Sequence, residues 1–255
     1  MHSVVIPVAD PSPLLRDRLL VHPRAAERVL QLLSAEDGAH GELCALVELD
    51  PALTAAVVRA ANATHLGYAR RVAGARHAIV LLGGGLVASL AASRVADLVF
   101  DTGRPDYPDW LWQHSLAVAS GCAVLAGEIG EPVDDAYTTG LLHDVGALLA
   151  ATNGVDPELD HCDDGAELLR RWNLPDKVVG GVRHQRARAA GLVGSLERLV
   201  AAASCFAAEL GAPGPEHTVS PTQALGLVQV HRRPDDVLAQ IEDDLARRTA
   251  VARGS

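Results

Sequence analysis

The sequence predicts an all-α protein, a multi-helix bundle made of two packed helical halves. Hydrophobic residues recur at helical spacing along nearly the whole chain, and the alternation typical of β-strands is almost absent. Hydrophobic residues make up 49% of the 255 residues but aromatic residues only 3%, so Ala, Leu and Val must form the core, which favours closely packed helices. The stretch DTGRPDYPD at 101–109 is the clearest break. We expect helical halves over 14–100 and 108–211, then a linker and an amphipathic helical tail over 212–255.

The first half contains clear signals for individual helices. In HPRAAERVLQLLSA (22–35), helical spacing predicts one buried face formed by Ala26, Val29, Leu30 and Leu33. Asp50 followed by Pro51 is a strong helix start, because Asp caps free backbone amides and Pro suits the first helical position. Two more helices are predicted near 75–82 and 85–100.

A glycine pattern between these two helices is similar to a nucleotide-binding fingerprint. Within AIVLLGGGLVASLA (78–91), the pattern G-x-G-x-x-A is formed by Gly83, Gly85 and Ala88. It binds a dinucleotide only when a strand precedes it and an acidic residue follows about 20 positions later. Asp97 and Asp101 come too early, and the flanking sequence is helical. We therefore interpret the glycines as a helix end and expect 78–82 to be helical; a strand there would favour cofactor binding.

The second half and the tail are also predicted to be helical. Helical periodicity covers five segments: 109–129, 134–151, 163–172, 175–185 and 193–210. A linker rich in Pro and Gly follows at 211–221. The tail carries one apolar stripe of Val237, Leu238, Ile241 and Leu245. Because an unpartnered stripe would leave the helix frayed, we expect it to pack on the body or on a second subunit, which makes the tail a candidate homodimer interface.

Charge and composition argue against several classes of function. The net charge of −10 disfavours a general nucleic-acid binder, which needs a basic surface. The N-terminus lacks the features of a secretory signal, and the longest uncharged run, 78–93, is shorter than the roughly 20 residues of a membrane span. The four cysteines are scattered without a C-x-x-C pair, which is typical of free thiols in a reducing compartment. We therefore expect a cytoplasmic protein without a membrane segment.

The candidate metal ligands lie in the second half. In TTGLLHDVGALL, His143 and Asp144 are adjacent in an apolar run, where burial is costly unless other groups satisfy the pair. His114 and His184 lie on other predicted helices, so a bundle can bring the four side chains together. Such ligands suit Zn, Mn or Fe, and a two-metal site can activate water for phosphoester hydrolysis. Any one of these histidines alone is more often a satisfied core or surface residue.

These motifs occur in an order that resembles a known family. Residues from about 14 to 210 are similar to the HDOD domain, the HD-related output domain of bacterial signalling proteins. The matching blocks are LVELDPALTAAVVRAANATHLG, ARHAIVLLGG, WQHSLAVAS, AYTTGLLHDVGALLA, GAELLRRWNLPDKVVGGVRHQ and ERLVAAASCFAAELG. The resemblance implies an all-helical fold whose second half is related to HD phosphohydrolases. It also implies a regulatory role, since family members are usually regarded as modules without demonstrated catalysis.

Three departures from the hydrolytic HD pattern imply a degenerate metal site. The resemblance puts Ser204 where the hydrolases carry the last Asp of H…HD…D. Ala147 replaces the lysine of HDxGK, and Gln185 stands where a second histidine is common. A serine hydroxyl is a poor substitute for a carboxylate that balances cationic charge, so we expect no cofactor or at most a single divalent Mn, Fe or Zn ion. If Ser204 lies beside the other ligands, Ser204→Asp is expected to raise metal affinity.

The leading functional hypothesis is a non-catalytic signal-transduction module that binds an unidentified protein in trans, or a nucleotide. The alternative is a metal-dependent phosphohydrolase or phosphodiesterase in which Arg183 and Arg186 contact the substrate phosphate. A solvated basic helix end is the simpler interpretation of that arginine cluster. A third hypothesis, DNA binding by a helix-turn-helix in LLRRWNLPDKVVGGVRHQRAR, is weak because the basic charge is local and the net charge is negative.

Overall fold

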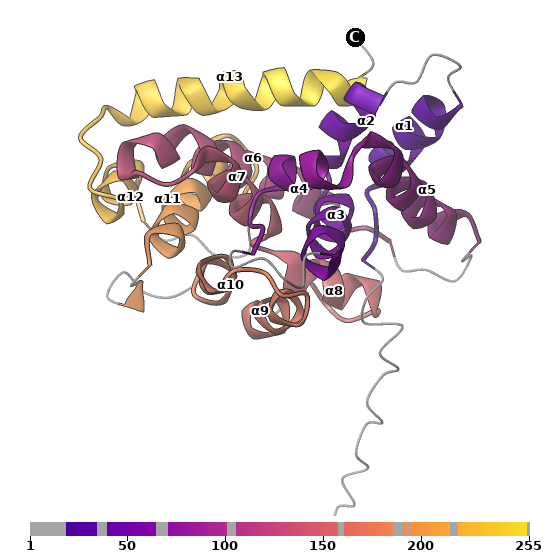
Figure 1. Ribbon diagram of the computed structural model, residues 1–255. Coiled ribbons are helices and arrows are strands. Elements are labelled where there is room, and N and C mark those ends of the chain that lie inside the picture. The colour runs from indigo at the N-terminus through magenta and orange to yellow at the C-terminus, as the bar shows by residue number, and fades with distance from the viewer. Residues whose placement is uncertain are drawn as a thin grey trace, which may run out of the picture.

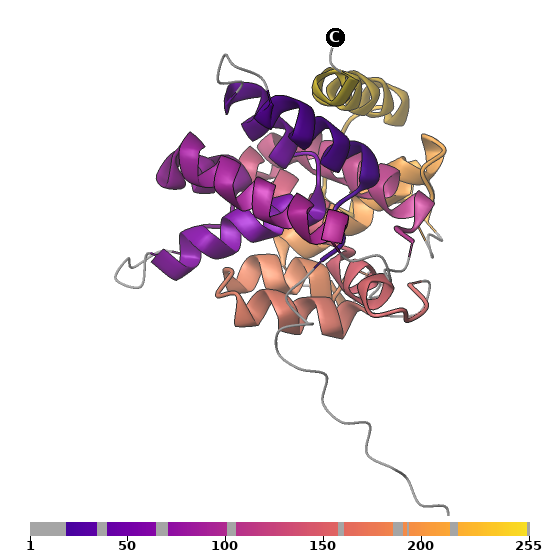
Figure 2. The same cartoon turned by 90° about the vertical axis from the view of Figure 1, so that its right-hand side faces the viewer.

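The computed structural model of the protein describes residues 19–34, 40–64, 71–100, 106–157, 161–185, 191–192, 194–214 and 219–253. In chain order the helices are α1 (Pro23–Leu33), α2 (His40–Val47), α3 (Pro51–Thr64), α4 (Ala75–Leu82), α5 (Gly84–Phe100), α6 (Asp109–Ala126), the 3-10 turn η1 (Gly127–Ile129), α7 (Val133–Leu142), α8 (Val145–Thr152), α9 (Cys162–Arg171), α10 (Asp176–Arg183), α11 (Ser195–Glu209), α12 (Pro221–Leu227) and α13 (Pro234–Arg253). No strand occurs in these ranges, which confirms the predicted all-α bundle. Figure 1 shows α1–α5 gathered on one side, and Figure 2 shows α9 and α10 on the face opposite α13.

In the first half, the predicted helix cap is confirmed and the predicted face of α1 is partly wrong. The Asp50 carboxylate accepts a hydrogen bond from the Leu53 amide at 2.9 Å, as expected of the residue that caps α3. The buried residues of α1 are Ala25, Ala26, Val29 and Leu32. Leu30 and Leu33 are instead 47% and 40% exposed. Helical spacing permits both stripes, and the packing of α1 against α2 and α5 selects the one with Leu32.

Gly83 separates α4 from α5, and the glycine pattern around it is not a nucleotide fingerprint. Residues 78–82 are helical, as predicted, so no strand precedes the glycines. Gly83 has a φ of +77°, which glycine adopts without strain, and its amide donates to the Ile79 carbonyl at 2.9 Å to end α4.

Among the described helices, none alone has the length and apolar character of a membrane span. α4 and most of α5 meet that test only as a pair, bent by 112°.

The segment predicted as one helix over 134–151 is two helices with a break at the His-Asp pair. α7 ends at Leu142 and α8 begins at Val145. Asp144 is the N-cap residue of α8, although its side chain makes no capping hydrogen bond. The carbonyl of Gly140 would accept from the amide of residue 144 in an uninterrupted helix, and here Nδ1 of His143 donates to it at 2.6 Å. The pair therefore lies at a helix junction.

Small residues allow α6, α7 and α11 to pack closely around this junction. A Cβ atom added at Gly140 of α7 would lie 2.9 Å from both Ala119 Cα and Cys122 Sγ of α6. A Cβ atom added at Gly121 of α6 would lie 2.9 Å from the Cβ atom of Ala203 on α11. The short distances bring the His-Asp junction against α6, which carries His114.

One core extends through both halves and holds the tail helix α13. Buried apolar residues from Leu19 to Ile241 form a continuous cluster. Val237 and Ile241 are fully buried and Leu245 is partly buried, so the predicted stripe packs on the body of the protein. The Arg248 guanidinium lies 4.0 Å from the centre of the Tyr137 ring on α7. α13 thus crosses the molecule from α12 to α2 (Figure 1), and a homodimer through this helix stays a prediction.

Candidate metal centre

Three of the four predicted ligands converge in the buried centre of the second half. His114 on α6 and the pair His143 and Asp144 offer ligand atoms that all lie within 4.8 Å of one another. The two imidazole Nε2 atoms are 3.1 Å apart. Oδ2 of Asp144 lies 3.2 Å from Nε2 of His143 and 3.6 Å from Nε2 of His114. Each of the three residues is at most 5% exposed, so the centre is shielded from solvent.

Backbone carbonyls fix the orientation and the tautomer of both histidines. Nδ1 of His114 lies 2.8 Å from the Ala212 carbonyl oxygen, and Nδ1 of His143 lies 2.6 Å from that of Gly140. A carbonyl oxygen only accepts, so each Nδ1 carries the hydrogen and each neutral ring presents the Nε2 lone pair. With both rings neutral, two lone pairs and a carboxylate oxygen would therefore face one another. Such an arrangement requires a cation or an additional proton to be stable.

The three ligand atoms fit a divalent metal ion of the imidazole-binding class. Bonds of about 2.0–2.2 Å to zinc place neighbouring ligand atoms about 2.8–3.6 Å apart in octahedral or tetrahedral coordination. The separations of 3.1, 3.2 and 3.6 Å match one face of such a polyhedron. Histidines that bind metals usually donate their other ring nitrogen to a carbonyl or carboxylate, as both do here. The centre can therefore hold one ion through two imidazoles and one carboxylate.

The chain leaving α11 covers this centre; we call residues 211–214 the strap. Ala212 of the strap supplies the carbonyl that accepts from His114. A Cβ atom added at Gly214 would lie 2.6 Å from Nε2 of His114, a distance that no real Cβ contact shows. Within the strap, Ala212 therefore orients the His114 ring, and Gly214 covers its Nε2 atom.

Asp144 also lines a narrow crevice, together with Gly146, Ala147, His161, Cys162 and Gln185. The side-chain amide of Gln185 donates to the His143 carbonyl at 2.7 Å and to Cys162 Sγ at 3.4 Å. Pockets that hold small molecules usually measure about 300–1,000 Å³. This crevice has no room for a water molecule, so it is not a substrate pocket.

The structure does not bring the fourth predicted ligand, His184, into the group. Its Nδ1 lies 3.0 Å from Oε1 of Glu197 on α11, and its side chain is 45% exposed. Arg183, a predicted phosphate contact, pairs with Asp163 at 3.1 Å. Arg186, the other predicted contact, lies outside the described residues. The pairing of His184 with Glu197 removes it from the triangle of ligand atoms.

Sequence reasoning missed the backbone groups that complete the centre. Nothing in the spacing of Gly140, Ala212 and Gly214 indicates that they contact the histidines; the motif GAPG at 211–214 indicates only a linker. Ser204 is 2% exposed on α11, which packs against α6. Its predicted position beside the three ligands stays a prediction.

Solved structures share this architecture. The crystal structure of the MmoQ response regulator from Methylococcus capsulatus str. Bath is 27% identical, with a TM-score of 0.70 over 88% of this chain and 98% of that chain. A virulence factor from Campylobacter jejuni subsp. jejuni has the same fold at 15% identity, with a TM-score of 0.64 over 92% of this chain and 95% of that chain.

Curated relatives match a shorter part of the sequence. Ribonuclease Y of Lawsonia intracellularis is 31% identical over 105 residues, which are 40% of this chain and 19% of that protein. Ribonuclease Y of Geobacter metallireducens is 38% identical over 81 residues, 31% of this chain and 14% of that protein. The chain thus spans a fifth or less of the length of these relatives.

Two family models match the chain itself. The HD domain matches residues 111–220, the part that contains the three converging ligands. The HDOD domain matches residues 19–154, more than half of the chain. This protein therefore belongs to the HDOD domain family.

Proposed function

We propose that this chain is a non-catalytic signal-transduction module with a degenerate HD-type centre that holds one divalent metal ion. His114, His143 and Asp144 would bind the ion and so tie α6 to the junction of α7 and α8. The observation that carries the proposal is the buried triangle of two Nε2 atoms and one carboxylate oxygen. These three groups carry one negative charge, whereas a pair of dications needs several anionic ligands.

The enclosure of the centre supports a structural role for the ion over a catalytic one. A catalytic metal keeps an open position for water or substrate, whereas a structural site is closed. Here Gly214 covers the ligand nitrogen of His114, and the crevice that reaches Asp144 has no room for a water molecule. When bound, the ion would supply positive charge that stabilises the converging acceptors.

A signalling role is supported by the likeness to the MmoQ response regulator, which extends over most of both chains. For this protein we propose that the helices around the centre transmit a conformational change to an unidentified signalling protein in trans. The second candidate function is a metal-dependent phosphohydrolase or phosphodiesterase. The partial likeness to ribonuclease Y supports that alternative.

Metal content and hydrolysis, measured on the same preparations, test the proposal. Elemental analysis and calorimetric titration with Mn²⁺ or Zn²⁺ should give one ion per chain, because three ligands with one negative charge suit one dication. His143→Ala should abolish that binding. The exposed His231→Ala is the matched control and should bind as the wild type does. Hydrolysis of bis(p-nitrophenyl) phosphate should not exceed the metal-only rate.

Two outcomes contradict the proposal in different ways. Two ions per chain, with phosphodiesterase activity that His143→Ala abolishes, would establish the enzyme. Absence of metal binding by the wild type would remove the ion and leave the triangle as a hydrogen-bonded part of the core.

A further inference from the structure

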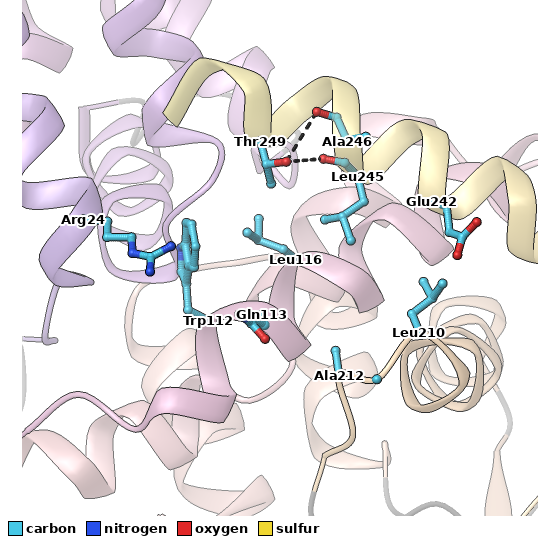
Figure 3. Close-up of a pocket in the computed structure, with 11 residues that line it drawn as sticks. Arg24, Trp112, Gln113, Leu116, Leu210, Ala212, Glu242, Leu245, Ala246 and Thr249 are labelled. Carbon is cyan, nitrogen blue, oxygen red and sulfur yellow. Dashed lines mark hydrogen bonds between the residues drawn. The ribbon is translucent and has the colours of Figure 1, made fainter. Parts of the chain in front are cut away.

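A groove of about 490 Å³ lies between α13 and the body of the protein (Figure 3). Trp112 and Leu116 of α6 form one apolar wall, and Leu245 of α13 forms the facing wall. The two charged side chains lie at opposite ends: Arg24 beside Trp112, and Glu242 near Leu210. The volume falls within the range of about 300–1,000 Å³ that is usual for small-molecule sites.

Arg24 is the charged group of this groove that can receive a ligand. Its guanidinium is exposed and forms no ion pair or side-chain hydrogen bond with any residue that the structure describes. The Thr249 hydroxyl, by contrast, donates to the Leu245 carbonyl at 2.8 Å within α13. Arg24 is therefore the side chain of the groove that can pair with an anion, at one end of an apolar channel.

We propose that this groove binds an aliphatic monocarboxylate of medium chain length. The carboxylate pairs with Arg24, because charge-assisted hydrogen bonds to a guanidinium are strong and directional. The alkyl chain lies between Trp112 and Leu245 and is removed from water there. Glu242 at the far end repels a second carboxylate, so the groove selects a monoacid over a diacid.

The groove also adjoins the metal centre through the strap. Ala212 lines the groove, and its carbonyl accepts the hydrogen bond from His114. A ligand in the groove therefore lies beside the residue whose carbonyl orients His114. The binding of the carboxylate itself does not depend on the presence of a metal.

Titration of the full chain with octanoate, followed by calorimetry and by Trp fluorescence, tests this inference. Ala246→Trp should lower octanoate affinity at least about tenfold, because Ala246 lines the groove and the indole would fill it. The matched control is Ala239→Trp, at an exposed position of α13 away from the groove, and it should bind as the wild type does.

The charge is tested separately from the apolar contact. Arg24→Gln should weaken octanoate about tenfold and leave 1-octanol unchanged, since the neutral probe lacks the anion. Arg233→Gln, an exposed arginine near the start of α13, is the control. Octanedioate should bind at least about tenfold more weakly than octanoate.

The inference is overturned if the wild type shows no saturable octanoate binding, or if Ala246→Trp and Ala239→Trp bind octanoate equally. It is also overturned if Arg24→Gln affects both probes alike or if octanedioate binds as octanoate does.

Discussion

At the scale of single residues, the strap and the His-Asp junction determine what the centre can bind. Ala212 acts through its carbonyl, so its side chain is free to vary, whereas Gly214 acts through the absence of a side chain. The sequence indicates His143 and Asp144 because two costly side chains are adjacent in an apolar run. It does not indicate Gly214, because contact with His114 arises only when a linker 100 residues away folds over α6.

Gly214→Ala should weaken metal binding without removing a ligand. The new methyl group would lie 2.6 Å from Nε2 of His114, so the ring or the strap must move. Disturbing the groups that orient a metal ligand typically costs about 10–100-fold in affinity, and we expect a loss in that range for Mn²⁺ by calorimetry. Gly226→Ala is the control, since a Cβ atom there meets nothing within 4 Å. Equal affinity in the two variants would show that the strap does not constrain the centre.

Buried Asp50 predicts a specific pH dependence of stability. Burial raises the pKa of its carboxyl from 3.8 to about 6, despite hydrogen bonds from the His22 and Leu53 amides. A carboxyl with a raised pKa binds its proton more tightly in the folded state. Its contribution to the free energy of unfolding is therefore largest below about pH 4 and falls as the pH rises to about 6. His22 acts in the opposite direction, because burial and the charge of Arg24 lower its pKa to about 4.

Asp50→Asn should remove the contribution of Asp50 to the free energy of unfolding, which falls as the pH rises, and leave the contribution of His22. Relative to the wild type, the free energy of unfolding of the variant should rise between pH 4 and 6 by on the order of 3 kcal/mol. Urea unfolding at closely spaced pH values measures the difference. Asp176→Asn, at an exposed helix start, should run parallel to the wild type. A parallel course for Asp50→Asn as well would show that Asp50 titrates normally.

At the scale of helices, local sequence signals predict where a helix occurs better than where a helix is interrupted. The helix start at Asp50 and Pro51 was predictable because both effects act within one turn. α12 also has a local signal in the sequence, because Ser220 and Gln223 form a capping box. The break between α7 and α8 at His143 has no local signal in the sequence. It is associated with the hydrogen bond from the His143 ring to the Gly140 carbonyl and with packing against α6. The contact of His184 with Glu197 has no local signal either, because Glu197 comes from another helix.

The tail helix α13 should depend on its buried stripe. Ile241 is fully buried, so Ile241→Ala should lower the free energy of unfolding by about 2–5 kcal/mol through lost burial and a residual cavity. Gln240→Ala, at the neighbouring exposed position, should change it by less than about 0.5 kcal/mol. Chemical denaturation of both variants provides the comparison. An equally small effect of Ile241→Ala would mean that α13 is not part of the cooperative core.

At the scale of the whole molecule, one apolar core connects the two halves and holds α13. A continuous apolar cluster extends through both halves, and the Trp112 indole donates to the Leu49 carbonyl at 2.9 Å to join them. α13 contacts α1 and α2 of the first half as well as α6 and α12 of the second. The candidate metal centre lies under the strap that begins the connection to this helix. An ion that fixes α6 against the α7–α8 junction would therefore affect surfaces in both halves.

Anomalous diffraction from crystals grown with Mn²⁺ tests the central claim most directly. The proposed function predicts a single manganese peak, about 2.0–2.3 Å from Nε2 of His114, Nε2 of His143 and a carboxylate oxygen of Asp144. His184 should still face Glu197, as it does in the structure. A second peak about 3.5–4 Å from the first would contradict the account, because that spacing is typical of two-metal hydrolytic sites.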